Sequence, residues 1–114
     1  MTASVIVRRL AALSGASAVS LGAYGAHVFK QSDPDDYQIV LFETANKYHF
    51  YHSLALLGAA HSGKPAVAGT LLIAGMGMFC GSLYHQAVTK DPALRKIAPI
   101  GGVAMIAGWL AIFL

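Results

Sequence analysis

Ionisable and polar side chains interrupt an apolar stretch near the middle of the chain. Residues 42–57 read FETANKYHFYHSLALL and place Glu43, Lys47, His49 and His52 within ten residues. Carboxylate, amine and imidazole groups can move protons or hold ligands, and imidazole is the commonest metal ligand in proteins. Such groups are costly in hydrocarbon and usually face a protein interior or water. The stretch therefore predicts a polar centre inside an otherwise apolar bundle.

Three roles are open for this polar centre. Hydrogen bonding between helices is favoured, because polar side chains commonly bridge membrane helices, at about 0.6 kcal/mol each. A proton or small-solute path would use the acid, the lysine and the histidines. A metal or haem site has less support, because His49 and His52 are only an i,i+3 pair without further ligand motifs. Ser53 lacks a nucleophile elbow and Cys80 lacks an acid–base partner, so no catalytic residue, metal or cofactor is expected.

The composition of the whole chain is that of an integral membrane protein. Of its 114 residues, 11% are charged and 56% are hydrophobic, whereas about 25% of residues are charged in soluble domains. The net charge of +3 comes from scattered residues, which argues against a nucleic-acid partner. The length fits a single domain, and the lone cysteine excludes an internal disulfide.

Four apolar segments are long enough to cross a bilayer as helices, which takes about 20 residues. Their approximate limits are 8–29, 37–60, 65–88 and 97–114. The first segment also has the basic, serine-rich character of a targeting peptide. A retained helix is favoured, because small residues recur in it every fourth position and form a packing stripe: Ser14, Ala18, Gly22 and Ala26. The predicted fold class is all-α, an antiparallel integral membrane four-helix bundle with both termini on the same side.

The later segments carry further packing and boundary signals. Gly77 and Gly81 match the GxxxG pattern of helix contacts, and Gly101 and Gly108 share one face of the last segment. Asp33 and Pro34 predict the start of the second helix, by capping it and opening its first turn. Within that helix the acid at 43 and the lysine at 47 are spaced for an ion pair.

Antiparallel threading brings most of the polar residues into one half of the membrane. The end of the first helix, the start of the second, the end of the third and the start of the fourth all lie on one side. The candidate polar cluster consists of His27, Glu43, Asn46, Lys47, His49, His52, Tyr84 and His85. With the second helix central, His49 is expected to meet His27 and His85.

Several motifs together resemble a known family. They are GAYGAH at 22–27, FETANKYHFYHSLALL at 42–57, FCGSLYHQA at 79–87 and APIGGVAMIAGW at 98–109. In order and spacing they resemble the transmembrane protein 256 family, small four-helix membrane proteins also known as domain of unknown function 423. The resemblance implies four spanning helices and a retained first helix, and it brings no established reaction, cofactor or ligand.

The resemblance also marks individual positions and a location. Gly25 and Gly102 join the predicted packing glycines, and the positions that recur without a known role are Gly22, Gly25, His27, His52, Gly101, Gly102, Gly108 and Trp109. The second motif looks more like the animal branch of the family than the bacterial one. That implies an organelle membrane, with the mitochondrial inner membrane expected if the source is eukaryotic.

Two functions follow as expectations. The first is a non-enzymatic structural or accessory bundle in a larger assembly, whose partners are the lipid bilayer and other membrane subunits or a second copy. The second is a small-ligand, metal or proton-path protein built on His27, Glu43, Asn46, His49 and His85. The second predicts that these side chains converge on one accessible cavity. An enzyme ranks third.

Overall fold

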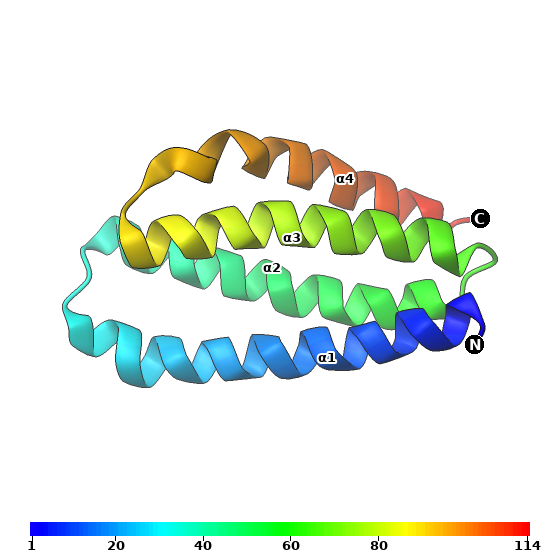
Figure 1. The fold of residues 1–114 in the computed structure, drawn as a ribbon, viewed down its shortest axis with the longest axis horizontal. Coiled ribbons are helices and arrows are strands. Elements are labelled where there is room, and N and C mark those ends of the chain that lie inside the picture. The colour runs from blue at the N-terminus through cyan, green and yellow to red at the C-terminus, as the bar shows by residue number, and fades with distance from the viewer.

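The computed structural model describes residues 1–114 and contains helices and no strands. The long helices are α1 (Ala3–Tyr24), α2 (Asp36–Ala60), α3 (Pro65–Thr89) and α4 (Ala98–Ala111). Short helical turns lie between α1 and α2, at Gly25–Phe29 and Lys30–Ser32, and between α3 and α4, at Pro92–Ile97. Consecutive helices run antiparallel and the two termini lie at the same end of the bundle (Figure 1). The predicted all-α, antiparallel fold with both termini on one side is confirmed.

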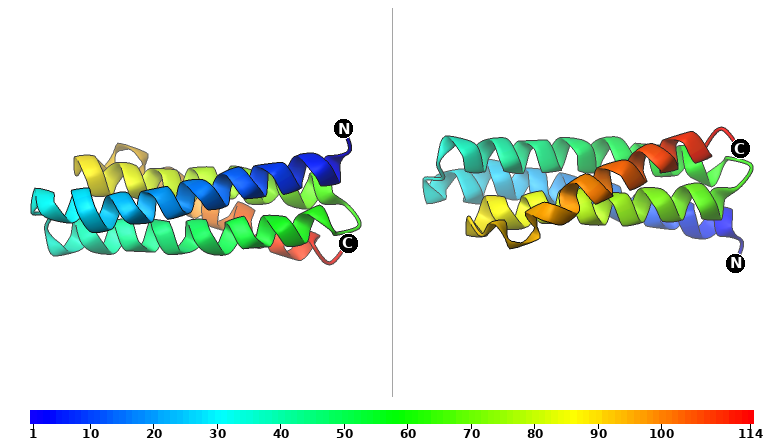
Figure 2. Two further views of the ribbon diagram at one scale, coloured as in Figure 1. Left: turned by 90° about the horizontal axis from the view of Figure 1, so that it is seen from below. Right: turned by 90° about the horizontal axis from the view of Figure 1, so that it is seen from above.

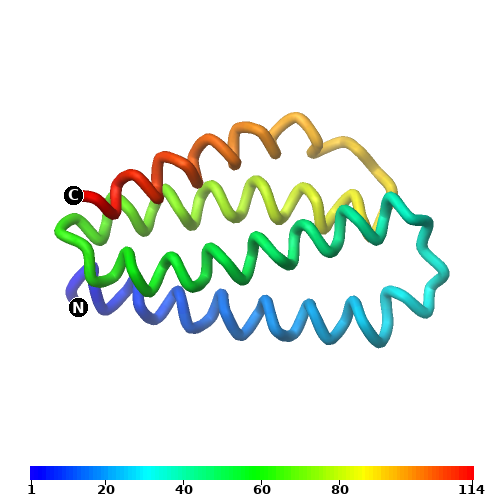
Figure 3. The backbone as a smooth tube through the Cα atoms, turned by 180° about the vertical axis from the view of Figure 1, so that it is seen from behind, coloured from blue at the N-terminus to red at the C-terminus, as the bar shows by residue number.

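The bundle is a flat plate, with extents of 45 × 27 × 19 Å. Each helix packs mainly on its neighbours in sequence: α1 on α2, α2 on α3, and α3 on α4. Figure 3 shows this order from behind, with α2 between α1 and α3. α4 crosses obliquely over α3, as the right view of Figure 2 shows, and it makes little contact with α2.

Three segments are long and apolar enough to cross a membrane: Ala3–Ser32, Pro65–Thr89 and Pro92–Ala111. α2 is not among them: its first half carries Asp36, Glu43 and Lys47, and polar residues such as His49 and His52 lower its hydropathy further. α2 instead lies between α1 and α3, and the bundle buries much of its surface. The protein thus covers its most polar helix with its more apolar ones. The predicted limits of four separate membrane crossings stay a prediction.

The start of α2 differs from the expectation. The helix begins at Asp36, and Asp35 caps it rather than Asp33, which takes a left-handed conformation with φ 57°. The Gln38 backbone N–H donates to Asp35 Oδ1 at 2.8 Å, and the Asp35 N–H donates to Gln38 Oε1 at 2.9 Å. This reciprocal capping box satisfies two backbone donors at once, which explains why the later aspartate is used.

The other boundaries follow the sequence signals. Pro65 opens α3, and Lys90 ends it in a left-handed conformation with φ 62°. Asp91 then accepts a hydrogen bond from the Ala93 N–H at 3.0 Å and caps the short 3₁₀ turn that leads into α4. The segment Lys90–Pro92 therefore ends α3 and starts the capped turn beyond it.

The end of the first helix contains a π-helical turn, Gly25–Phe29. It places the Phe29 ring stacked on Phe42 of α2, with centroids 4.7 Å apart. Phe42 also meets Tyr84 of α3 edge to face at 5.2 Å. Gly25 is required here, because a Cβ at this position would overlap the Phe42 ring. One aromatic side chain thereby joins three helical segments.

The predicted packing glycines divide into two groups. In the first group, a Cβ on Gly22 would be 3.2 Å from Asn46, one on Gly101 would be 2.5 Å from the Phe79 backbone N, and one on Gly108 would be 2.7 Å from Leu72. Gly75, which was not predicted, is as tightly packed, with a Cβ 2.6 Å from the Met105 backbone N. Gly102 has ordinary contact distance, 3.9 Å, to Phe79, and a Cβ on Gly77 or Gly81 would meet nothing within 4 Å. The GxxxG pair therefore does not pack within this chain.

Candidate functional site

The centre of the predicted polar cluster is a hydrogen-bonded group that joins three helices. Asn46 of α2 donates through Nδ2 to the Ala18 carbonyl of α1 at 2.9 Å and to Tyr84 Oη of α3 at 3.1 Å. His49 Nδ1 lies 3.0 Å from the same Tyr84 hydroxyl. A small residue at 22 allows this approach, because the Asn46 amide occupies the space beside Gly22.

A second polar link lies about one turn further along α2. Ser53 donates to the His49 carbonyl at 2.7 Å, and its hydroxyl oxygen lies 2.6 Å from that of Ser14 on α1. Ser14 Oγ also lies 3.5 Å from the Met76 sulfur on α3. The small residues of the predicted α1 stripe therefore face α2 from Ser14 to Gly22, while Ala26 is exposed.

His52 belongs to a separate contact on the other side of α2. The Trp109 indole N–H of α4 donates to His52 Nε2 at 3.0 Å. Because an indole nitrogen only donates, Nε2 accepts and the ring proton sits on Nδ1, which donates to the Tyr48 carbonyl at 2.7 Å. His52 is buried, and both of its nitrogens are used. Its part is to join α4 to α2.

The remaining members of the predicted cluster lie apart from this centre. His27 is exposed. Glu43 pairs with Lys30 at 3.7 Å rather than with Lys47, so the predicted ion pair within α2 is wrong. The 30–43 pair forms because the turn after α1 returns the chain beside the first half of α2. Lys47 lies over the Tyr48 ring, with Nζ 5.7 Å from its centroid.

The expected meeting of three histidines does not occur. His85 Nδ1 is buried and has no hydrogen-bond partner, His49 contacts Tyr84, and His27 points away on the surface. No group of three or more His, Cys, Asp or Glu side chains is placed to hold a metal ion. Of the candidate polar cluster, Asn46, His49 and Tyr84 therefore meet.

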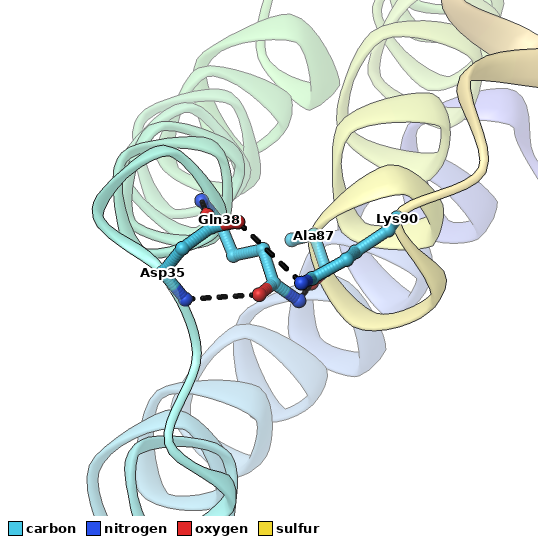
Figure 4. Close-up of polar contacts among 4 residues, drawn as sticks. All are labelled: Asp35, Gln38, Ala87 and Lys90. Atoms are coloured by element: carbon cyan, nitrogen blue, oxygen red, sulfur yellow. Dashed lines mark hydrogen bonds and ion pairs between the residues drawn. The ribbon is translucent and has the colours of Figure 1, made fainter.

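Sequence reasoning missed the contacts that tie α2 to the end of α3. Gln38 donates through Nε2 to the Ala87 carbonyl at 2.8 Å, and Lys90 pairs with Asp35 at 3.6 Å (Figure 4). Gln38 stands three residues after Asp35, which is the capping-box spacing, so the contact between these two residues could have been predicted from the sequence. The contact to Ala87 depends on tertiary packing and leaves no local signal.

The two largest hollows in the bundle are lateral grooves. The larger lies between α2 and α4 over α3, with a volume of about 830 Å³, and its walls include Tyr48, Tyr51, His52, Phe79, Gly102 and Trp109. The smaller, about 410 Å³, lies between α1 and α3 and is lined by Ser14, Ser17, His49, Gly77, Gly81 and Tyr84, among others. Both are dominated by apolar side chains.

The fold and the polar contacts define the class of protein. It is a helical membrane protein whose interior polar groups mostly form hydrogen bonds between helices. The family model described as a protein of unknown function, DUF423, matches residues 21–102. The chain belongs to this family, as its motifs predict.

Relatives from distant organisms cover nearly the whole chain. The UPF0382 membrane protein YwdK of Bacillus subtilis is 40% identical over 110 residues, covering 90% of this chain and 89% of the relative. A UPF0382 membrane protein of Staphylococcus epidermidis is 42% identical over 108 residues, covering 90% and 88%. The UPF0382 membrane protein C1782.12c of Schizosaccharomyces pombe is 38% identical over 108 residues, covering 88% and 92%. No solved structure matches the chain. The protein is thus a membrane protein of a family without an assigned activity.

Proposed function

We propose that the protein is a non-enzymatic accessory bundle that docks, through the opening between α1 and α3, against a helix of another membrane subunit. The observation that carries the proposal is the position of Gly77 and Gly81. They line this opening, and a Cβ on either would meet nothing within 4 Å. Small residues let membrane helices approach closely, and glycines four apart are a recurrent contact surface.

The surroundings of the two glycines support a helix as the binding partner. Ser14 and Ser17 of α1 and Cys80 of α3 line the same opening, so each wall has small side chains among larger ones such as Leu13 and Ile73. The Ser17 hydroxyl bonds back to the Leu13 carbonyl of its own helix at 2.8 Å, so it adds little polarity to the groove. A partner helix would gain close van der Waals contact, which is the main attraction between helices in lipid.

The proposal is tested with the tagged full-length protein purified from its native membrane in mild detergent. Gly77→Leu is expected to release a partner that co-purifies with the wild type, because leucine fills the approach. Gly102→Leu is the matched control, since it adds the same side chain to the other groove. Free monomers in several mild detergents, or equal partner loss in both variants, would contradict the proposal. A second copy as the partner would make the contact a self-association.

The proton-path or ligand alternative rests on a smaller set of residues than expected. Of its five predicted side chains, Asn46 and His49 meet at Tyr84, whereas Glu43 pairs with Lys30 and His27 is exposed. No continuous row of ionisable groups connects them. Interhelical bonding therefore accounts for the polar centre better than transport does.

The mitochondrial inner membrane remains a proposal for a eukaryotic source. The motif at residues 42–57 motivates it, while the matched relatives include bacterial and fungal membrane proteins. A fluorescent fusion with markers for each organelle tests the location directly. Signal confined to another membrane would overturn it.

A further inference from the structure

We propose that a small polar pocket at one end of the bundle binds the headgroup of phosphatidylethanolamine, with the ammonium at Asp35 and the phosphate at Lys90. The pocket lies where α2 begins and α3 ends, and its volume is about 240 Å³. Its lining consists of Asp35, Tyr37, Gln38, Leu41, Gln86 and Lys90. It shares no lining residue with the opening between α1 and α3, so the inference goes beyond the accessory role and does not depend on it.

A buried amide without a partner is the main evidence for a ligand. Gln86 is only 8% exposed, and its side chain makes no hydrogen bond within the chain. The amide is not sealed inside the protein, because the only buried side-chain polar atom without a partner is His85 Nδ1. The Gln86 amide therefore opens on the pocket that this residue lines. It has two donor hydrogens and an acceptor oxygen to offer.

The other buried glutamine of the pocket shows what is unusual about Gln86. Gln38 is also 8% exposed, but its Oε1 accepts from the Asp35 N–H at 2.9 Å and its Nε2 donates to the Ala87 carbonyl at 2.8 Å. Buried polar side chains in native proteins are usually paired in this way. Gln38 thus serves the fold, while the hydrogen-bonding capacity of Gln86 is left for a bound molecule.

The two charged groups of the pocket also have capacity to spare. Figure 4 shows the Lys90 side chain extending from the end of α3 toward Asp35, and its Nζ lies 3.6 Å from Asp35 Oδ2. A charge-assisted hydrogen bond is shorter, at about 2.7–2.9 Å. The two side chains are 64% and 56% exposed for Lys90 and Asp35, and exposed ion pairs add little stability. Both groups can therefore turn to a ligand at little cost.

This arrangement of charges selects a zwitterion. A ligand with a single charge would be attracted by one of two opposite charges 3.6 Å apart and repelled by the other. A primary ammonium can donate to Asp35 Oδ2, the Gln86 amide oxygen and the Tyr37 hydroxyl, while a phosphate can accept from the Lys90 ammonium and the Gln86 amide nitrogen. A choline group has no N–H and cannot donate, so the pocket should distinguish ethanolamine from choline.

The pocket lies where the bundle leaves the hydrocarbon. The segment Pro65–Thr89 is long and apolar enough to cross a membrane, and Lys90 is the residue that follows it. The bundle is 45 Å long, which exceeds the roughly 30 Å of hydrocarbon in a bilayer. The turns after α1 and α3 lie at this same end (Figure 1). They carry further exposed charged residues: Lys30, Asp33, Asp36, Asp91, Arg95 and Lys96.

Apolar side chains beside the pocket favour a lipid over a free zwitterion. Leu41 lines the pocket one turn deeper along α2 than Tyr37, and its neighbour Val40 is 56% exposed. Acyl chains attached to the headgroup can lie along this apolar surface. The volume of about 240 Å³ is smaller than the 300–1,000 Å³ typical of sites that enclose a whole ligand. It suits a headgroup whose chains remain in the bilayer.

Native mass spectrometry of the full-length protein in mild detergent measures the binding. The protein is titrated with dioleoyl phosphatidylethanolamine, phosphatidylcholine or phosphatidylglycerol, which differ only in their headgroups. We expect about tenfold tighter binding of phosphatidylethanolamine than of phosphatidylcholine, equivalent to about 1.4 kcal/mol. Phosphatidylglycerol, which has no cation for Asp35, is expected to bind no better than phosphatidylcholine.

Variants test the two ends of the headgroup separately. Asp35→Asn keeps a good helix cap but removes the charge, and it should reduce the preference for ethanolamine over choline to about parity. Asp33→Asn, an exposed acid outside the pocket, is the matched control and should keep the tenfold preference. Gln86→Leu should lower the preference severalfold. Lys90→Gln should weaken both lipids equally, because both carry the phosphate, whereas Lys96→Gln should weaken neither.

The results that would overturn the inference are equally specific. Equal or weaker binding of phosphatidylethanolamine, relative to either other lipid, would show that the pocket does not select this headgroup. An unchanged preference in Asp35→Asn or in Gln86→Leu would place the ammonium elsewhere. Displacement of the bound lipid by an equal concentration of soluble phosphoethanolamine would identify a free zwitterion as the ligand. The accessory role is tested by partner co-purification, so either proposal can fail alone.

Discussion

Two adjacent glycines, Gly101 and Gly102, face opposite environments on α4. Gly101 lies in the tight seam with α3, where a Cβ would be 2.5 Å from the Phe79 backbone nitrogen. Gly102 lies at the edge of the α2–α4 groove, where the nearest atom would be 3.9 Å away. One side of α4 is therefore fixed by backbone contact, whereas the other meets α2 mainly through one hydrogen bond, from Trp109 to His52.

The difference shows how a small bundle can leave an apolar face open and still hold its helices in place. In lipid, burying apolar surface gives no special advantage, so association depends on close packing and on hydrogen bonds. The α3–α4 seam uses the first of these, through Gly75, Gly101 and Gly108. The contact of α1 and α3 with α2 uses both, through Gly22 and the Asn46 amide.

The largest effect is expected where the seam is tightest. Gly101→Ala forces α4 away from α3 and should destabilise the protein by about 1–3 kcal/mol, the usual range for overpacking. Gly102→Ala, one residue further on, should stay within about 0.5 kcal/mol of the wild type. Reversible unfolding in mixed detergent micelles measures both. Equal losses would mean that the two sides of α4 do not differ as described.

Asn46→Ala should rank second. It removes the two hydrogen bonds of the Asn46 side chain, to the Ala18 carbonyl and to Tyr84, and bonds of this kind between membrane helices are worth about 1–2 kcal/mol together. The same unfolding assay applies. Thr44→Ala on the same helix, which loses no side-chain hydrogen bond, is the control, and a loss no greater than the control's would show that the three-helix junction contributes little.

Trp109→Phe tests the open side of α4. It keeps an aromatic ring but removes the donor to His52 Nε2, so a loss near 0.6 kcal/mol, the average for such bonds, is expected. Because the seam with α3 is untouched, a crosslink between cysteines placed on α3 and α4 should form as fast as in the unsubstituted pair. A slower crosslink would show that the groove side also holds α4 in place.

Glu43→Gln should have the smallest effect. It removes the ion pair with Lys30. The Glu43 side chain is 64% exposed and the Lys30 side chain 54%, and exposed ion pairs contribute a few tenths of a kcal/mol to stability. Unfolding at low and high salt should differ little between variant and wild type. A loss above 1 kcal/mol would show that this pair is shielded from solvent, near the end of the bundle where α1 meets α2.

The sequence was most informative about what adjacent residues decide together. The lengths of apolar runs, Pro65 at the start of α3 and Asp91 before the last turn all act locally, so four helices and their order were predictable. The small-residue stripe of α1 was also readable, because Ser14 to Gly22 share a helical face.

The site was less predictable, because its contacts depend on distances between helices. The sequence offers Glu43 more than one lysine as an ion-pair partner. The path of the turn after α1 decides that the partner is Lys30 and not Lys47. Trp109 fits an interfacial anchor on local grounds, and its bond to His52 appears only when α4 is placed beside α2. Likewise the GxxxG spacing predicted a packing surface, but not that Gly77 and Gly81 face away from the other helices of this chain.

The π turn after α1 has a consequence for how relatives of this protein vary. Such a turn holds one residue more than an ordinary helical turn, so deleting one residue there could restore a regular helix. The deletion would rotate the following side chain by about 100° and remove Phe29 from its stack on Phe42. In an alignment, a one-residue gap before position 29 should therefore be accompanied by loss of one or both aromatic residues, and chains that retain both should retain the spacing.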